Sequence, residues 1–251
     1  MVRMILHGCN GRMGKMIEGI VNDDPDIEIA EGVDINTESA GSFPVVDSIE
    51  KADASADVVV DFGHASAVDR VIDWCVKNGM PLVECTTGLS EDTLSAIREA
   101  AGKIAMFKSA NMSLGINIIQ KILKENSAKL SEAGFDIEIV EKHHRTKLDA
   151  PSGTALALAD SVNEGLSARK DYVFDRSGRR MVRPETEIGI SAVRGGTIVG
   201  DHDVIFAGQD EVITFSHTAY SRAVFAKGAV EAAKFVAGRP AGAYDMSDVL
   251  N

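Results

Sequence analysis

The sequence predicts an α/β protein, with a doubly wound parallel sheet followed by a second, α+β domain built on a mixed open sheet. Short apolar runs alternate with amphipathic helical segments up to about residue 110. Beyond Ser113, longer strand-like runs follow one another with fewer helices between them. A glycine-spaced turn also follows the first apolar run directly. These three observations divide the chain into two regions of different sheet type.

The first region contains five short strand-like runs that are almost continuously apolar, at residues 2–7, 27–33, 57–62, 81–85 and 104–107. Such runs are typical of parallel strands buried on both faces of a sheet. Segments 11–23 and 66–79 carry apolar residues at helical spacing and connect these strands. This alternation of strands and helices therefore predicts a parallel sheet with helices on both faces.

The second region opens with a long amphipathic helix, at 113–130. Its strand-like runs are 135–142, 190–194, 197–208 and 211–219. The final amphipathic segment, 221–238, is expected to return to the first domain. We therefore predict one domain from residues 1–113 plus 221–251, and a second from 114–220. The polar segment Lys170–Pro184 is either a solvated loop or a mobile flap.

Composition narrows the classes of function. The 251 residues carry a net charge of −12, which argues against a nucleic-acid or anionic-membrane partner. Three cysteines without a CxxC pair argue against a disulfide framework and a structural metal site. The N-terminal segment lacks a signal-peptide layout, and no apolar run approaches the roughly 18 residues of a membrane span. We expect a cytoplasmic protein without a metal.

The turn after the first strand has the spacing GCNGRMG, with glycines at 8, 11 and 14. Glycines at such a turn let the backbone approach a pyrophosphate at a helix N-terminus, and Asp34, ending the second strand, suits the ribose hydroxyls. The motif is GxxGxxG rather than GxGxxG, so a purely structural tight turn is the alternative. Asp34 has no adjacent arginine for a 2′-phosphate. The pattern favours a nicotinamide dinucleotide, with NADH preferred to NADPH.

The segment Glu141–Thr154 gathers cationic or titratable side chains, namely His143, His144, Arg145 and Lys147. A helix start follows, and its N–H groups at residues 152–154 favour an anion. The cluster predicts a site for a small molecule with carboxylates or phosphates. Simpler interpretations remain open. The histidines could only end a strand, the charged residues could be a solvated ion-pair cluster, and the helix start could have no ligand.

Five motifs resemble one family over nearly the whole chain: GCNGRMG, TTG at 86–88, ANMSLGIN at 110–117, EKHHRTKLDAPSGTAL and RGGTIVGDHDVIFAG. They are similar to bacterial 4-hydroxy-tetrahydrodipicolinate reductases. The resemblance implies a homotetrameric cytoplasmic enzyme of the diaminopimelate route to lysine. It would reduce a cyclic dicarboxylate imine with NADH or NADPH, and its second domain would bind substrate and mediate oligomerisation.

The same resemblance implies roles for individual residues. The proton-transfer positions are His143 and Lys147. The substrate-binding positions are His144, Lys147, Ser152, Gly153 and Thr154. The cofactor-binding positions are Gly8, Cys9, Asn10, Gly11, Arg12, Met13, Asp34, Cys85, Thr86, Thr87, Ser109, Ala110, Asn111 and Met112. The chain departs from the family pattern at Cys85, Gly63 and Met112, where glycine, threonine and phenylalanine are usual.

Hydride delivery to a cyclic imine requires a positioned acid. We hypothesise that Lys147 pairs with a substrate carboxylate while His143 supplies or relays the proton. Cys85 is expected to be a packed residue rather than a nucleophile, and His202 and His217 to be structural. Two other functions stay open. One is an NAD(P)-dependent dehydrogenase acting on an aspartate-derived aldehyde or semialdehyde, and the other is a nicotinamide-binding regulator without turnover.

Overall fold

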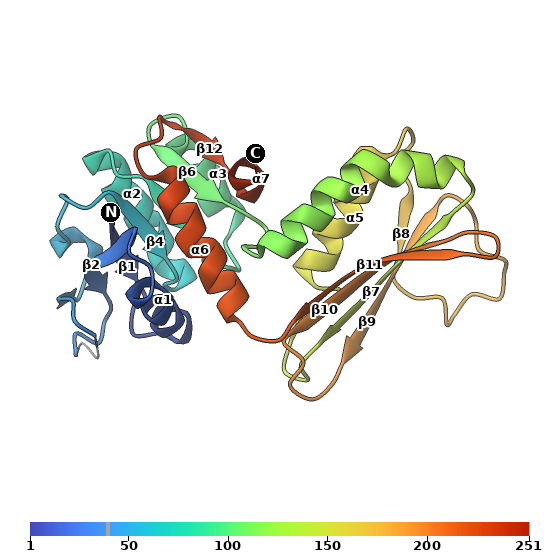
Figure 1. Cartoon of the computed structure of the whole chain (residues 1–251), viewed down its shortest axis with the longest axis horizontal. Helices are drawn as coiled ribbons and strands as arrows, with labels where there is room; N and C mark the ends of the chain where they lie inside the picture. Colours follow the sequence, from blue (N-terminus) through green and yellow to red (C-terminus); the bar gives the residue numbers. More distant parts are fainter. Residues whose placement is uncertain (39–40, 251) are drawn as a thin grey trace. The chain divides into compact units, whose positions relative to one another are not determined.

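The computed structural model describes residues 1–38 and 41–250, and the chain divides into two compact units. The first unit comprises Met1–Leu114 together with Ala223–Asn251, and the second comprises Gly115–Arg222. Each unit has its own sheet (Figure 1). The first unit has a hydrophobic core on each face of its sheet, and the second unit has a core of its own.

The first unit contains a seven-stranded sheet in the order β12-β6-β5-β4-β1-β2-β3, and all its strand pairs are parallel. Its strands are β1 (Val2–His7), β2 (Ile27–Val33), β3 (Val45–Val46), β4 (Val58–Asp61), β5 (Leu82–Glu84), β6 (Ala105–Lys108) and β12 (Gly242–Tyr244). The order reverses direction after β1, which is the doubly wound arrangement that the sequence predicts.

Helices cover both faces of this sheet. They are α1 (Arg12–Asn22), α2 (Val68–Asn78), α3 (Glu91–Ala100), α6 (Ala223–Val236) and α7 (Met246–Val249), with short 3₁₀ turns at Ile49–Lys51 and Ala65–Ala67. Alternate residues of β4 enter different cores: Val58 and Val60 pack on the side of α1 and α6, and Val59 packs on the side of α2 and α3. Burial on both faces explains why these strands read as continuous apolar runs.

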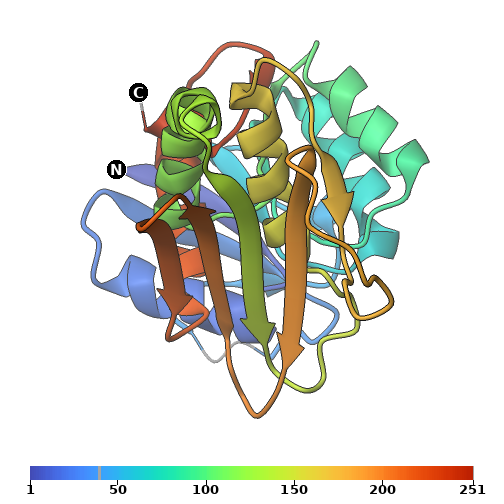
Figure 2. The same cartoon turned by 90° about the vertical axis from the view of Figure 1, so that its right-hand side faces the viewer.

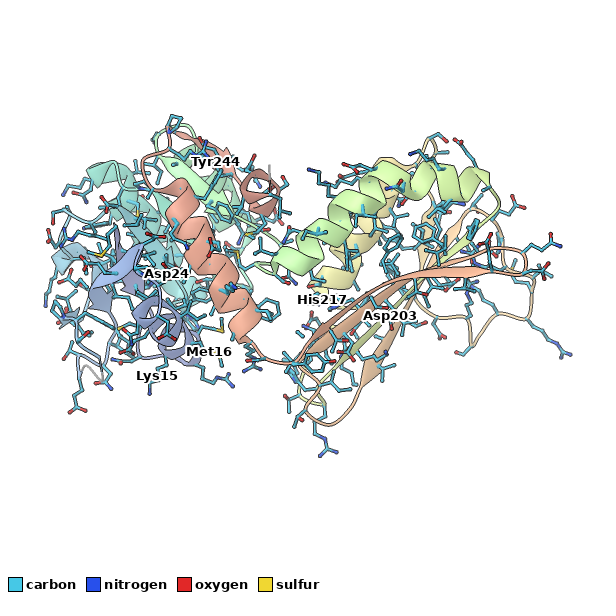
Figure 3. The ribbon with its side chains drawn as sticks, in the orientation of Figure 1. Lys15, Met16, Asp24, Asp203, His217 and Tyr244 are labelled. Carbon is cyan, nitrogen blue, oxygen red and sulfur yellow. The ribbon has the colours of Figure 1, made fainter. Side chains whose placement is uncertain are left out.

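The helix α6 returns to the first unit, where it packs on α1 in one of these cores. Lys234 on α6 also forms a 2.9 Å ion pair with Asp24, which is labelled in Figure 3. The elements β3, β12 and α7 were not predicted from the sequence. All three are too short to show the hydrophobic periodicity of a strand or a helix.

The second unit contains a five-stranded sheet in the order β11-β10-β7-β9-β8. Its elements are α4 (Leu114–Glu132), β7 (Asp136–His143), α5 (Gly153–Gly165), β8 (Asp171–Val173), β9 (Glu187–Arg194), β10 (Gly200–Ala207) and β11 (Val212–Ala219). Strand β10 is antiparallel to both β7 and β11, whereas β7, β9 and β8 run parallel. Figures 1 and 2 show α4 and α5 on one face of this sheet. The predicted mixed α+β sheet is confirmed.

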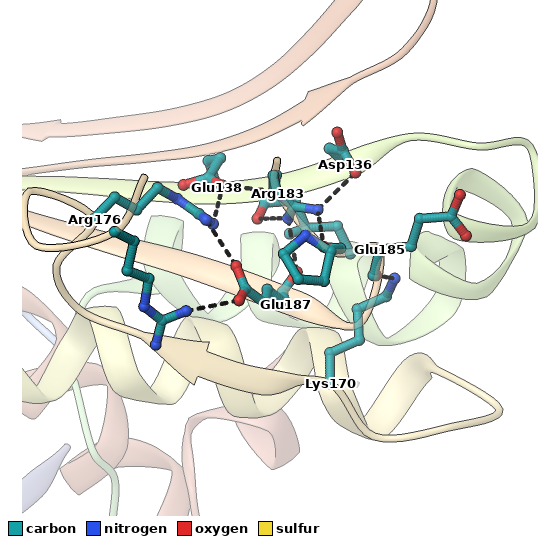
Figure 4. A network of polar contacts seen from close by, with 10 residues as sticks. Asp136, Glu138, Lys170, Arg176, Arg183, Glu185 and Glu187 are labelled. Carbon is teal, nitrogen blue, oxygen red and sulfur yellow. Dashed lines mark hydrogen bonds and ion pairs between the residues drawn. The ribbon is translucent and has the colours of Figure 1, made fainter. Parts of the chain in front are cut away.

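The polar segment that was expected to be a loop or a flap contains β8 and then a loop held by arginines (Figure 4). Arg183 donates to the carboxylates of Asp136 and Glu138 at 2.6 and 2.9 Å. Arg176 and Arg179 both donate to Glu187, at 2.7 and 2.8 Å. These ion pairs attach the loop to β7 and β9 in the structure.

Candidate active site

The glycine turn after β1 needs residues without a side chain. Gly8 has a φ of +78°, and a Cβ there would lie 2.6 Å from the carbonyl oxygen of Phe62. A Cβ on Gly14 would collide with the Cys9 carbonyl. The N-cap of α1 is Gly11, and no side chain of the described residues caps this helix. The turn thus leaves a bare helix N-terminus facing the carboxyl end of the sheet, the geometry that binds a phosphate.

A cavity of about 320 Å³ opens beside this turn, within the first unit. Its walls include His7, Gly8, Asp34, Phe62 and His64. The backbone N–H groups of Asn10 and Asn36 donate to the two oxygens of the Asp34 carboxylate, at 3.0 and 3.1 Å. These hydrogen bonds fix the carboxylate at the edge of the cavity, at the end of β2. A pre-organised acceptor there suits the hydroxyls of a ribose.

The other cofactor positions that the resemblance implies also lie after carboxyl ends of strands in this sheet. Cys85–Thr87 follows β5, and Ser109–Met112 follows β6. Ser109 donates from its hydroxyl to the carbonyl of Asn111 at 3.1 Å, and Met112 is buried in the core shared with α6. Burial raises the pKa of the Cys85 thiol well above its ordinary value, so this cysteine is a poor nucleophile. The loops converge on the edge where parallel α/β sheets bind nucleotides.

The second cluster lies in the second unit, where Glu141 is completely buried on β7. Arg194 donates to both carboxylate oxygens at 2.7 Å, and His143 Nδ1 lies 2.6 Å from Oε2. The backbone N–H of Ser152 donates to Oε1 at 3.0 Å. Burial alone would raise the pKa of Glu141, but these donors outweigh it and lower the pKa. Glu141 is therefore an ionised carboxylate that orients the groups around it.

His143 is buried at the end of β7, and its ring packs edge-on against the ring of His202 with 5.1 Å between centroids. Burial is the largest cause that lowers the pKa of His143, and the charges of Lys147 and Arg194 act in the same direction. Glu141 opposes them but does not reverse the shift. His143 is thus mostly neutral near pH 7, with Nδ1–H held by the carboxylate and Nε2 as its remaining functional atom.

The residues after His143 form a turn that leads into α5. Lys147 lies 2.8 Å from the carboxylate of Asp149, and its side chain is 22% exposed. His144 Nδ1 lies 2.8 Å from the Thr146 hydroxyl. Gly153 and Thr154 stand in the first turn of α5, which begins after the N-cap Ser152. The five proposed substrate-binding residues thus lie between the end of β7 and the first turn of α5, and the Lys147 ammonium among them is partly exposed.

One expectation for this segment was wrong. The N–H of Ser152 is not available to an external anion, because the buried carboxylate of Glu141 accepts it. The Ser152 hydroxyl is also engaged, 3.0 Å from His202 Nε2 and accepting from the N–H of Ala155. Ser152 therefore acts as the cap that fixes the start of α5. Gly153 after it is exposed, and its backbone N–H interacts with the Asp149 carboxylate.

Sequence reasoning missed two members of this cluster, Glu141 and Arg194. Successive side chains of β7 alternate between partly exposed and buried, and the buried ones are Ile137, Ile139, Glu141 and His143. The sequence pattern could therefore have indicated that Glu141 is a buried acid two residues before a buried histidine. The partner Arg194 could not be found this way, because it comes from a different strand and is distant in sequence.

Comparisons with known proteins identify one family over almost the whole chain. The family model described as the N-terminus of dihydrodipicolinate reductase matches residues 2–112, and the model for its C-terminus matches residues 115–250. The chain belongs to the dihydrodipicolinate reductase family.

Relatives in this family are similar along their full length. The 4-hydroxy-tetrahydrodipicolinate reductase of Caldanaerobacter subterraneus subsp. tengcongensis is 50% identical, with 100% of this chain and 98% of the relative covered. That of Clostridium tetani is also 50% identical at the same coverage. A solved dipicolinate-bound dihydrodipicolinate reductase from Paenisporosarcina sp. TG-14 has the same fold, with a TM-score of 0.76, 24% identity, and coverage of 98% and 97%.

No helix within residues 1–38 and 41–250 is both long and apolar enough to cross a membrane. Within the same residues, histidines, cysteines and acids form no group of three or more that could hold a metal ion.

Proposed function

We propose that this chain reduces 4-hydroxy-tetrahydrodipicolinate to tetrahydrodipicolinate with a nicotinamide cofactor, in the diaminopimelate route to lysine. Membership of the dihydrodipicolinate reductase family supports this function. The observation that carries it in the structure is the cluster in the second unit, where a buried ionised Glu141 holds His143 close to Lys147 and the start of α5. Such a cluster suits a small dicarboxylate and a proton transfer.

The residues of the first unit fit a dinucleotide. Gly8–Met13 would hold the pyrophosphate, Asp34 the ribose hydroxyls, and the segments Cys85–Thr87 and Ser109–Met112 the nicotinamide side. When bound, the cofactor supplies the hydride. The fit rests on the positive φ of Gly8, on the uncapped N-terminus of α1 and on the cavity beside them.

In the second unit, Lys147 would pair with one substrate carboxylate. The first turn of α5, at Gly153 and Thr154, would hold the other together with His144. Asp149 lies 2.8 Å from the Lys147 ammonium, so it would compete with a substrate carboxylate for this lysine. A bound dicarboxylate would displace Asp149 and add negative charge near His143. That charge raises the pKa of the imidazole, so His143 becomes the proton donor once substrate is bound.

We also propose that NADH is preferred to NADPH. Among the residues that the structure describes, the wall of this cavity carries three carboxylates, Asp34, Asp47 and Glu50, and one arginine, Arg70. A 2′-phosphate would add negative charge beside these acids. Equal or better kcat/KM with NADPH would contradict this preference.

A homotetramer in the cytoplasm is the proposed state of the enzyme. Helices α4 and α5 cover one face of the five-stranded sheet, while the opposite face carries partly exposed side chains such as Val193 and Val212. A sheet commonly buries its second face against another layer, and a second copy of this chain would provide one. Light scattering coupled to size-exclusion chromatography measures the number of subunits directly.

The test of function follows NADH absorbance after mixing the protein with the freshly generated condensation product of pyruvate and aspartate semialdehyde, and repeats it with NADPH. Oxidation with this substrate supports the reductase. Oxidation only with an aspartate-derived aldehyde would favour the other dehydrogenase class. NADH binding without oxidation of either substrate would favour a regulator.

A further inference from the structure

Two acidic residues stand side by side in the core of the first unit. Asp61 ends β4 and Glu84 ends β5, and they are paired residues in the parallel ladder. Both side chains are completely buried. One oxygen of each carboxyl group has partners: Asp61 Oδ1 accepts from the N–H of Gly63 at 2.7 Å, and Glu84 Oε1 accepts from the N–H of Thr86 at 2.6 Å. The other two oxygens, Asp61 Oδ2 and Glu84 Oε2, are buried without a partner among the described residues.

Two ionised carboxylates cannot both be stable in this position. They would repel each other in a medium of low dielectric constant, and each would leave a buried acceptor without a donor. A single proton removes both problems, because a protonated carboxyl group is a donor and a carboxylate beside it is an acceptor. Burial, with the charge of Asp61 as the next cause, raises the pKa of Glu84 to about 9. The proton therefore resides on Glu84 at neutral pH.

The pair is connected to three loops that follow the carboxyl ends of strands. Asp61 Oδ1 lies 2.6 Å from Nδ1 of His7, the last residue of β1, so it holds the start of the glycine turn. Through Gly63 it also holds the loop after β4, and Glu84 holds the loop after β5 through Thr86. His7 and Gly63 line the cavity beside the glycine turn.

We propose that Asp61 and Glu84 share one proton and that this acid pair is the positioning element of the cofactor site. The inference rests on the cofactor site proposed above. With one proton, the pair carries one negative charge, and its hydrogen bonds hold the three loops in position. Loss of that proton places two like charges in contact under the loops and weakens cofactor binding.

Other titratable groups surround the pair on every packed element. His7 faces Asp61 from β1, Lys108 is the ladder partner of Glu84 on β6, and two thiols lie nearby, Cys75 on α2 and Cys85 after β5. Burial, together with the charges of Asp61 and Glu84, raises the pKa of both thiols well above the ordinary value of 9.0. The thiols therefore do not titrate in the range where Glu84 does.

The first test detects the proton without using activity. Carbon NMR of protein labelled at the glutamate side-chain carboxyl should show one glutamate that remains protonated at pH 7 and titrates near pH 9. Glu84→Gln should remove this signal. Asp61→Asn should move its titration to lower pH, because one of the charges that favours the proton is gone. The same spectrum is recorded with the aspartate carboxyls labelled, and ionisation of both Glu84 and Asp61 at pH 7 overturns the shared proton.

The second test measures NADH affinity by fluorescence from pH 7 to 10, with circular dichroism to verify folding. Wild-type affinity should fall above pH 9, by at most about tenfold per pH unit for one linked proton. Glu84→Gln keeps a donor toward Asp61, so it should bind NADH at pH 7 like the wild type and lose less affinity at high pH. Glu31→Gln is the matched control, since Glu31 is also buried and also accepts a backbone N–H, from Asp53 at 2.7 Å, but its ladder partner on β1 is Ile5 rather than a second acid.

The outcomes separate the two proposals. Identical pH profiles for wild type and Glu84→Gln overturn the positioning role. Absence of NADH binding by the wild type at every pH overturns the cofactor site, while the NMR titration still decides whether the proton is shared.

Discussion

Each unit contains a histidine whose Nδ1 lies 2.6 Å from a completely buried carboxylate, His7 beside Asp61 and His143 beside Glu141. The surroundings differ. Arg194 and two further donors keep Glu141 ionised. Asp61 faces a second acid, Glu84, whose pKa is raised. The comparison teaches that burial does not fix the charge of a carboxyl group, because the donors that the fold supplies decide whether a counter-ion or a proton neutralises it.

The largest expected effect tests the charged cluster of the second unit. Lys147→Ala should lower kcat/KM for the cyclic imine by about 10²–10⁴-fold, because it removes the cation proposed to pair with a substrate carboxylate and to assist proton transfer. NADH binding should be unchanged. Lys142→Ala is the control, since this lysine pairs with Asp203 on the sheet. Near-normal turnover in Lys147→Ala would refute the assignment.

The same substitution in the two clusters should have effects of opposite sign, and Glu141→Gln is the destabilising one. It leaves Arg194 without its counter-ion. Removing one partner of a buried pair costs about 3–5 kcal/mol, and because Arg194 is partly exposed we expect about 2–3 kcal/mol. Urea denaturation measures the loss in the free energy of unfolding. Asp203→Asn, which breaks a half-exposed pair with Lys142, should cost below about 1 kcal/mol.

The pH dependence of turnover tests His143. Its pKa lies below the ordinary 6.5 in the free protein, mainly because of burial. If a dicarboxylate binds as proposed, its charge should raise this pKa. The loss of kcat at alkaline pH should then occur at a higher pH than the loss of kcat/KM. His143→Gln should abolish both limbs. Coincident limbs in the wild type would show that substrate does not change the proton affinity of His143.

Glu84→Gln should show the smallest effect within any single pH unit, and its sign is opposite. Between pH 4.5 and about 9 folded Glu84 holds a proton that the unfolded chain releases, so stability falls as pH rises through this window. Glutamine has no such proton, so the variant should gain stability relative to wild type as pH rises from 5 to 9, by at most about 1.4 kcal/mol for each pH unit. A difference in Tm that does not change with pH would contradict the raised pKa.

Much of the architecture could be predicted from the sequence. The apolar runs of the first region predicted parallel strands, since residues such as Val58 and Val59 pack on opposite faces. The strand alternation and the long helix predicted the mixed sheet of the second unit. Short edge elements such as β3 and β12 were missed, because two or three residues carry no period.

The sequence by itself determined the longer elements, the glycine turn and the segment from His143 to Thr154, because these depend on neighbours along the chain. Only the tertiary structure decided which buried acids carry a charge. Arg194 reaches Glu141 through the pairing of β9 with β7, and Glu84 meets Asp61 through the pairing of β5 with β4. The chain segment between β7 and α5 folds back so that the N–H of Ser152 donates to Glu141. Protonation depends on distances of a few ångströms between strands, and strand register sets those distances.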